Sequence, residues 1–167
     1  MIAAEHGDRA FFDALHAAAR KERDRHDRLL LLETMGSFRD PAIAREAMRI
    51  ALSDEFPARE AIVLVYGATH AAETRGPAYD FVRENFGELA DKLPSREAAG
   101  LVAAGSALCD ETRRAEVEAF FRERMASLPG GPRRYAQGME QLRTCAAFRA
   151  AQAPAVARFF TAAHASR

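Results

Sequence analysis

The chain has 167 residues, a length that suits one domain with a core large enough to fold without a metal or disulfide staple. Lys+Arg and Asp+Glu both number 24, so the net charge is zero. This balance argues against nucleic acid or a membrane as a partner, because both attract a basic excess. No apolar run approaches the roughly 20 residues of a membrane span, and the start MIAAEHGDRAFF lacks the features of a signal peptide.

Two cysteines, Cys109 and Cys145, lie far apart in the sequence. Neither belongs to a C-x-x-C pair or lies near a histidine in a metal-binding spacing. We interpret them as two reduced, partly buried thiols, which predicts a cytoplasmic location. A disulfide between them is the alternative.

Nearly every segment has helical spacing of apolar residues, beginning with two helices in the first 36 positions. The first carries Phe12, Leu15 and Ala19 on one face. The second is predicted over Leu29 to Met35 and ends at Gly36, and the charged run before it, KERDRHDR, is typical of a solvated corner.

Asp40 and Pro41 mark the start of a third helix, because Asp caps free N–H groups and Pro suits the first helical position. The apolar positions that follow are Ile43, Ala47, Ile50 and Ala51. A fourth helix is predicted from about Arg59 to Thr69. Its AIVLVY run at 61–66 is rich in β-branched residues, so a strand there is the rival interpretation.

The segment GPAYDFVRENFGELADKLPS at 76–95 predicts a fifth helix. Its apolar stripe is Ala78, Val82, Phe86, Leu89 and Leu93. Ser95 is expected to cap a sixth helix that carries Leu101 and Val102.

A seventh helix should begin at Asp110 or Thr112, and PGGP at 129–132 should separate it from an eighth. Pro154 is expected to open a last helix. The apolar positions of these helices are Val117, Phe120, Phe121, Met125 and Leu128, then Tyr135, Met139, Leu142 and Ala146, then Val156, Phe159 and Phe160.

Helices of this length with short corners form antiparallel hairpins. Each hairpin has an apolar stripe that it cannot cover alone, so successive hairpins stack into a curved solenoid. The sequence therefore predicts an all-α fold, a superhelix of helical hairpins of the HEAT or armadillo kind, as a single domain over residues 1–167.

The sequence contains no recognisable catalytic or metal-binding pattern. No two of the five histidines are three or four positions apart, as a zinc-protease helix requires, and there is no G-x-S-x-G or phosphate-binding glycine loop. We therefore expect no catalytic residue, metal ligand or cofactor within this chain.

Four segments, in this order, resemble landmarks of the C-terminal helical domain of zinc aminopeptidases of the aminopeptidase N and puromycin-sensitive group. They are LLLLETMGSFRDPAIAREAMRIALSDE at 29–55, RGPAYDFVRENFGELADKLP at 75–94, CDETRRAEVEAFF at 109–121 and GGPRRYAQGMEQLRTCAAFRA at 130–150. The family usually has Trp where this chain has Tyr79 and Phe86, and these exchanges keep size and apolar character.

The resemblance implies a domain that follows a catalytic domain, with the zinc ligands outside this chain. The whole enzyme would be a hydrolase that releases N-terminal amino acids from peptides, and this domain alone would be inactive. It would cover the active site and limit or bind the peptide, so its implied partners are its own catalytic domain and the peptide substrate, with neither nucleic acid nor membrane.

Arg39, Arg75 and Tyr79 are the candidate peptide-binding residues, because they lie near corners from which a side chain can reach a concave face and bind a carboxylate. Local salt bridging is the alternative role for both arginines. Two other functions stay open: a free-standing scaffold that binds a protein partner, and an unrecognised enzyme with its own site.

Overall fold

The computed structural model describes residues 2–165, and the side chains of residues 3–161. These residues form α1 (Ile2–Glu5), α2 (Arg9–Lys21), α3 (Arg25–Met35), α4 (Pro41–Ile50), α5 (Ala58–Ala68), α6 (Arg75–Lys92), α7 (Ser95–Ala98), the 3-10 helix η1 (Ala99–Leu101), α8 (Val102–Ser106), α9 (Arg114–Ala126) and α10 (Gly131–Ala165). No strand occurs between residues 2 and 165, and AIVLVY at 61–66 lies inside α5. The predicted all-α class is confirmed.

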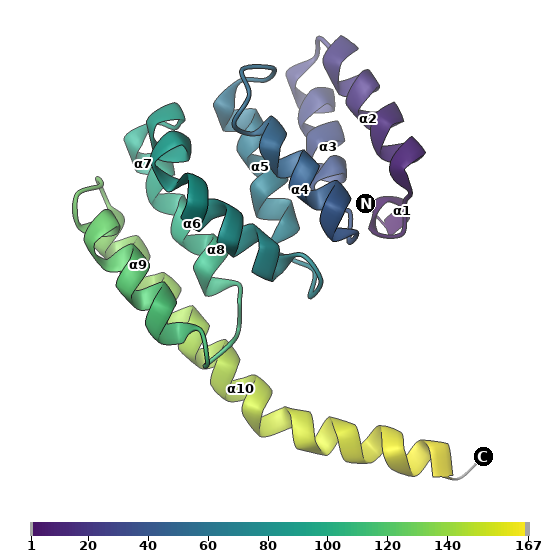
Figure 1. Ribbon diagram of the computed structural model, residues 1–167, viewed down its shortest axis with the longest axis vertical. Helices are drawn as coiled ribbons and strands as arrows, with labels where there is room; N and C mark the ends of the chain where they lie inside the picture. The colour runs from purple at the N-terminus through teal and green to yellow at the C-terminus, as the bar shows by residue number, and fades with distance from the viewer. Residues whose placement is uncertain (1, 166–167) are drawn as a thin grey trace.

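Consecutive helices pair, and the pairs stack along a curve (Figure 1). The contacts run α2 with α3, α4 with α5, α6 with α7 and α8, and α9 with α10 within pairs. Between pairs, α3 packs on α5, α4 on α6, and α8 on α10. One apolar cluster runs through the stack, from Ala4 in α1 to Leu142 in α10. This neighbour-to-neighbour packing is the predicted superhelix of hairpins.

Aspartate caps set the starts of the early helices. The Asp40 carboxylate accepts hydrogen bonds from the backbone N–H groups of Ala42 and Ile43, at 2.8 and 3.0 Å, as the Asp-Pro pair predicts. Asp24 does the same for α3, which begins at Arg25 and not at Leu29. Residues 22–24 of the charged run form the predicted corner, and residues 25–28 form the first turn of α3.

A glycine contact brings α3 and α5 unusually close together. A Cβ atom on Gly67 of α5 would lie 2.6 Å from the carbonyl oxygen of Gly36, at the end of α3. A Cβ on Gly36 would lie 3.1 Å from the carbonyl oxygen of Val63. Gly36 therefore ends a helix and also lets two backbones touch.

Glu60 is a buried charged residue, with 5% of its side chain exposed. Arg28 of α3 donates to its carboxylate at 2.8 Å, and Arg25 approaches it at 3.3 Å. The Arg28 hydrogen bond, followed by the charges of both arginines, lowers the pKa of Glu60 against the opposing effect of burial. The carboxylate stays ionised and connects α3 to α5.

The predicted sixth helix is divided into α7, η1 and α8. Ser95 is the first residue of α7 and makes no capping bond, because Pro94 holds the position before it. Leu101 and Val102 are buried as predicted. The backbone changes to a 3-10 helix at η1. There the Tyr66 hydroxyl lies 2.7 Å from the position that a Cβ atom on Gly100 would occupy, so glycine leaves room for it.

Cys109 and Cys145 form a disulfide with their Cα atoms 5.1 Å apart, so the prediction of two reduced thiols was wrong. The corner after α8 folds back onto α10, and this contact between distant segments cannot be seen in the spacing of the cysteines. Cys109 has a left-handed backbone (φ 53°), and the Asp110 side chain caps the following turn at the N–H of Thr112. The helix α9 itself starts only at Arg114.

The prediction that Pro154 opens a separate helix was also wrong. α10 continues through Pro154 to Ala165, although proline removes one backbone hydrogen bond from a helix. Ala146 is the last buried residue of α10, and Figure 1 shows the helix beyond it leaving the stack of hairpins. The expected stripe of Val156, Phe159 and Phe160 is exposed.

Candidate anion-binding site

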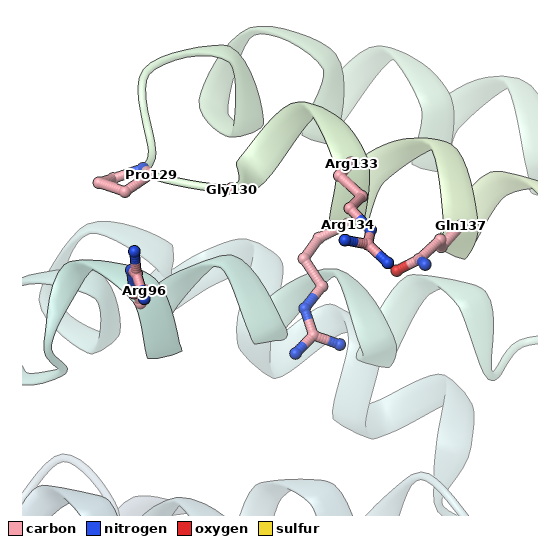
Figure 2. Close-up of a pocket in the computed structure, with 6 residues that line it drawn as sticks. All are labelled: Arg96, Pro129, Gly130, Arg133, Arg134 and Gln137. Carbon is pink, nitrogen blue, oxygen red and sulfur yellow. The ribbon is translucent and has the colours of Figure 1, made fainter.

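The N-terminal end of α10 faces α7 across a hollow of about 530 Å³. It is lined by Arg96, Pro129, Gly130, Arg133, Arg134 and Gln137, and we call it the arginine pocket. Figure 2 shows Arg134 reaching from α10 toward the neighbouring helices, Arg133 beside Gln137, and Arg96 across from Pro129.

The corner between α9 and α10 positions two of the three arginines. Gly130 has φ of 76°, a left-handed conformation that favours glycine. A Cβ on Gly131 would lie 1.9 Å from the carbonyl oxygen of Met125, so the corner closes onto the end of α9 only with glycine there. Arg133 and Arg134 then fall in the first turn of α10, and the predicted break at PGGP is confirmed.

The arginine pocket carries positive charge without a counter-charge. Within residues 3–161, none of its three arginines forms an ion pair, and Glu97, next to Arg96, is held by Arg59 at 2.9 Å. The N-terminal end of a long helix adds a partial positive charge. Three guanidinium groups and a helix end together favour an anion such as a carboxylate.

Tyr66 lies close enough to feel the charge of Arg134, but its phenol does not neutralise the positive charge of the pocket. Burial raises the pKa of Tyr66 to about 12, while the Arg134 charge opposes that rise and the Glu97 charge adds to it. The phenol is therefore neutral near pH 7. Because the pocket is lined by guanidinium, amide, proline and glycine groups, it has no nucleophile or general base and is suited to binding.

The structure places Arg39 and Arg75 outside the arginine pocket. Arg39 forms an ion pair with Glu5 of α1, although 43% of its side chain is exposed. Arg75 donates to the backbone carbonyl oxygens of Ala71 and His70 at 3.2 and 3.3 Å, which fixes the turn before α6. Local pairing occupies both side chains, and their role in peptide binding stays a prediction.

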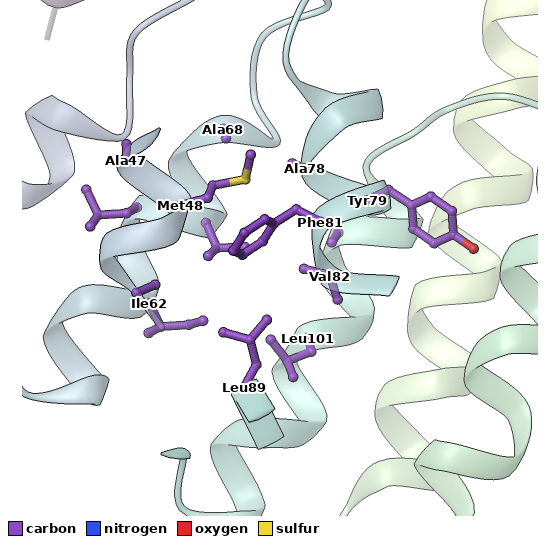
Figure 3. Packing of buried hydrophobic residues seen from close by; sticks show 14 of the residues in the cluster. Ala47, Met48, Ile62, Ala68, Ala78, Tyr79, Phe81, Val82, Leu89 and Leu101 are labelled. Carbon is purple, nitrogen blue, oxygen red and sulfur yellow. The ribbon is translucent and has the colours of Figure 1, made fainter. Parts of the chain in front are cut away.

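Tyr79, the third candidate, is fully buried (Figure 3). Its ring contacts Phe120 and Phe121, with ring centroids 6.3 Å apart in each case, and the Arg113 guanidinium lies 4.8 Å from its centroid. Burial raises the pKa of Tyr79 to about 12, and its hydroxyl has no hydrogen-bond partner among the described residues. In this conformation Tyr79 serves the core and presents no surface to a ligand.

Tyr79→Phe should leave the free energy of unfolding unchanged or raise it by up to about 1 kcal/mol, because it removes a buried hydroxyl that has no partner. The measurement is urea denaturation followed by circular dichroism. Tyr135→Phe is the matched control: its hydroxyl donates to the carbonyl oxygen of Glu118 at 3.2 Å, so this change should cost about 0.5–1.5 kcal/mol. A larger loss for Tyr79→Phe than for Tyr135→Phe would contradict the assignment.

Sequence reasoning missed the three arginines of the pocket, although each follows a proline-containing corner. Arg96 comes after Leu93-Pro94-Ser95, and Arg133 and Arg134 come after PGGP. Arg39 and Arg75 were selected because they also lie near corners, although both come before the proline. Many arginines in this chain lie near a corner between helices, so this feature alone does not identify a binding site. The fold is needed to show which corners lie side by side.

No three His, Cys, Asp or Glu side chains come together as a possible metal site in the part of the chain that the structure describes. We assign no metal ligand to these residues. No helix described here has the length and apolar character that a bilayer crossing requires.

The match to a known protein family agrees with the resemblance of the four sequence segments. The family model of the ERAP1-like C-terminal domain matches residues 1–144, which include the arginine pocket, all the helices before α10 and the first part of α10. A search of curated proteins finds no match to the chain. On the evidence of the family model and the all-helical stack, the chain belongs to the family of ERAP1-like C-terminal domains.

Proposed function

We propose that this chain is the C-terminal domain of a zinc metalloaminopeptidase, and that it covers the active site and binds the far end of the peptide substrate. The family match and the curved stack of hairpins support this role. A stack of hairpins forms a curved surface without catalytic groups. Such a surface can enclose an active site without reacting with the substrate.

The observation that carries the proposal is the set of three arginines that form no ion pair within residues 3–161. An aminopeptidase holds the N-terminus of its substrate at the catalytic centre. The other end of the peptide is a carboxylate, and this is the group that the helical domain can bind. Arg96, Arg133 and Arg134 can hold it through charge-assisted hydrogen bonds.

In this proposal the catalytic domain of the same enzyme supplies the zinc and the groups that break the peptide bond. The residues of this chain bind and orient the peptide and restrict access by size. The proposed partners are therefore the catalytic domain and the peptide, in the cytoplasm. The disulfide gives that location no support, because such bonds persist mainly in oxidising compartments.

In the whole enzyme, Arg133→Ala/Arg134→Ala should raise KM for peptides with a free C-terminal carboxylate by about 10-fold or more, because charge-assisted hydrogen bonds are lost. KM for the same peptides with an amidated C-terminus should change little, and kcat should be retained for both. Steady-state kinetics on matched free and amidated peptides measures the difference.

Arg143→Ala is the control, since Arg143 is exposed on α10 and does not line the pocket. The same assay on Arg75→Ala tests the candidate taken from the sequence. If the double variant shifts KM equally for free and amidated peptides, the pocket does not bind the carboxylate.

A further inference from the structure

A second hollow lies between α4 and α6, which pack side by side in the stack (Figure 1). Its walls are Arg45, Arg49 and Leu52 on one side and five residues between Pro77 and Asn85 on the other, and we call it the α4–α6 hollow. It shares no residue with the arginine pocket and has a volume of about 240 Å³. Since a water molecule takes up about 30 Å³ of liquid, the hollow holds roughly eight waters, which suits a ligand the size of a small amino acid.

The α4 wall of the hollow is cationic. Arg45 and Arg49 lie one turn apart with exposed side chains, and neither forms an ion pair or a side-chain hydrogen bond among residues 3–161. Like charges four positions apart on a helix repel each other. A carboxylate between the two guanidinium groups relieves this repulsion and gains charge-assisted hydrogen bonds.

The α6 wall carries negative charge and hydrogen-bond acceptors. Asp80 is held by Arg113 at 2.6 Å, whereas Glu84 is exposed and forms no ion pair among the same residues. Next to it, Asn85 interrupts the helix with φ of −116° and ψ of 19°. Its side-chain nitrogen donates to the carbonyl oxygen of Phe81 at 2.8 Å, and this competing bond accounts for the kink. The Asn85 carboxamide oxygen accepts no hydrogen bond from residues 3–161, so it is available to a donor.

Apolar side chains complete the hollow. Leu52, Pro77 and Phe81 line it together with the charged groups. The two arginines stand on one wall and Glu84 on the other, and no ion pair joins these walls within residues 3–161. A ligand that carries a negative charge, a positive charge and an apolar group matches all three kinds of lining.

We propose that the α4–α6 hollow binds a free α-amino acid with an apolar side chain. The α-carboxylate lies between Arg45 and Arg49, the α-ammonium donates to the Glu84 carboxylate and the Asn85 oxygen, and the side chain packs on Phe81. Binding here does not depend on the arginine pocket. Only the origin of the ligand, as the product that an aminopeptidase releases, rests on the proposed function.

L-Leucine is the probe that tests the chemical class of the ligand. Amide NMR spectra of the 167-residue chain should show saturable shifts in α4 and α6, with a dissociation constant on the order of 1 mM, because the ligand is small and the charges are exposed. N-acetyl-L-leucine lacks the ammonium group and L-leucinamide lacks the carboxylate. Each should bind about 10-fold more weakly or worse, because one wall of the hollow then has no partner.

Arg45→Gln/Arg49→Gln and Glu84→Gln should each raise the dissociation constant for L-leucine by about 10-fold or more, because each removes charge-assisted hydrogen bonds. All three side chains are exposed, so the fold should be retained. Glu88→Gln, one turn further along α6, and Arg143→Gln on α10 are the matched controls. Both side chains are exposed and outside the hollow, so the dissociation constant should stay within about twofold.

Arg133→Ala/Arg134→Ala separates this site from the arginine pocket, and it should leave the affinity for L-leucine unchanged. The comparison of free and amidated peptides tests the pocket independently, so either site can fail alone. An absence of saturable shifts up to about 20 mM L-leucine would overturn the proposal. So would equal binding of N-acetyl-L-leucine, which indicates an anion site only, normal binding by the Glu84→Gln variant, or shifts confined to α7 and the start of α10.

Discussion

Gly67→Ala is expected to destabilise the chain by about 3 kcal/mol or more, because the added methyl group has no space. Its Cβ would lie 2.6, 2.7 and 2.9 Å from the carbonyl oxygen, carbonyl carbon and Cα of Gly36. These are backbone atoms, which cannot rotate away as a side chain can. The helices α3 and α5 would have to separate, and the Glu60–Arg28 ion pair between them would lengthen.

Urea denaturation of the purified chain, followed by circular dichroism, measures this loss. Gly87→Ala is the matched control, because it lies in α6 with no atom within 4 Å of the added Cβ. That change should be neutral or stabilise the chain by about 0.5–1 kcal/mol, since alanine restricts the unfolded state. If both variants had equal stability, the close crossing of α3 and α5 would be wrong.

Removal of the disulfide should lower the free energy of unfolding by about 3–4 kcal/mol, because the bond closes a loop between residues 36 positions apart. Cys109→Ser/Cys145→Ser removes it genetically, and a reductant removes it chemically. Each should shift the urea midpoint of the chain to a lower concentration by a similar amount.

The double variant provides its own control, since reductant should have no effect on it. Thiol labelling of the denatured, unreduced wild-type chain should find no free cysteine. Two reactive thiols, together with a midpoint that ignores reductant, would restore the interpretation of a reduced pair.

Local signals predicted most of the helices. Asp40-Pro41 and PGGP each act within one turn of chain, through a cap or through a backbone conformation that favours glycine, so no distant contact is needed to interpret them. The helical spacing of Phe12 and Ala19, or of Met139 and Leu142, identified residues that the structure buries. These features lie in the sequence itself.

Contacts between distant segments were not predictable in the same way. The start of α3 looked like a solvated corner because its arginines are charged, yet Arg28 is held by Glu60, which lies 32 positions later. The same limit applies to the disulfide and to the arginine pocket, which Arg96 shares with Arg133 and Arg134 only because η1, directly after α7, packs on α10. Tyr79 was misjudged in the opposite direction: its position near a corner suggested exposure, but the side chain is buried in the core.

Because α10 is continuous through Pro154, it fixes the distance between the arginine pocket at its start and the exposed phenylalanines near its end. At 1.5 Å per residue, Arg133 in the pocket and the exposed Phe160 are about 40 Å apart along the helix. A peptide whose carboxylate is held in the pocket would need about twelve extended residues to reach as far along α10 as Phe160.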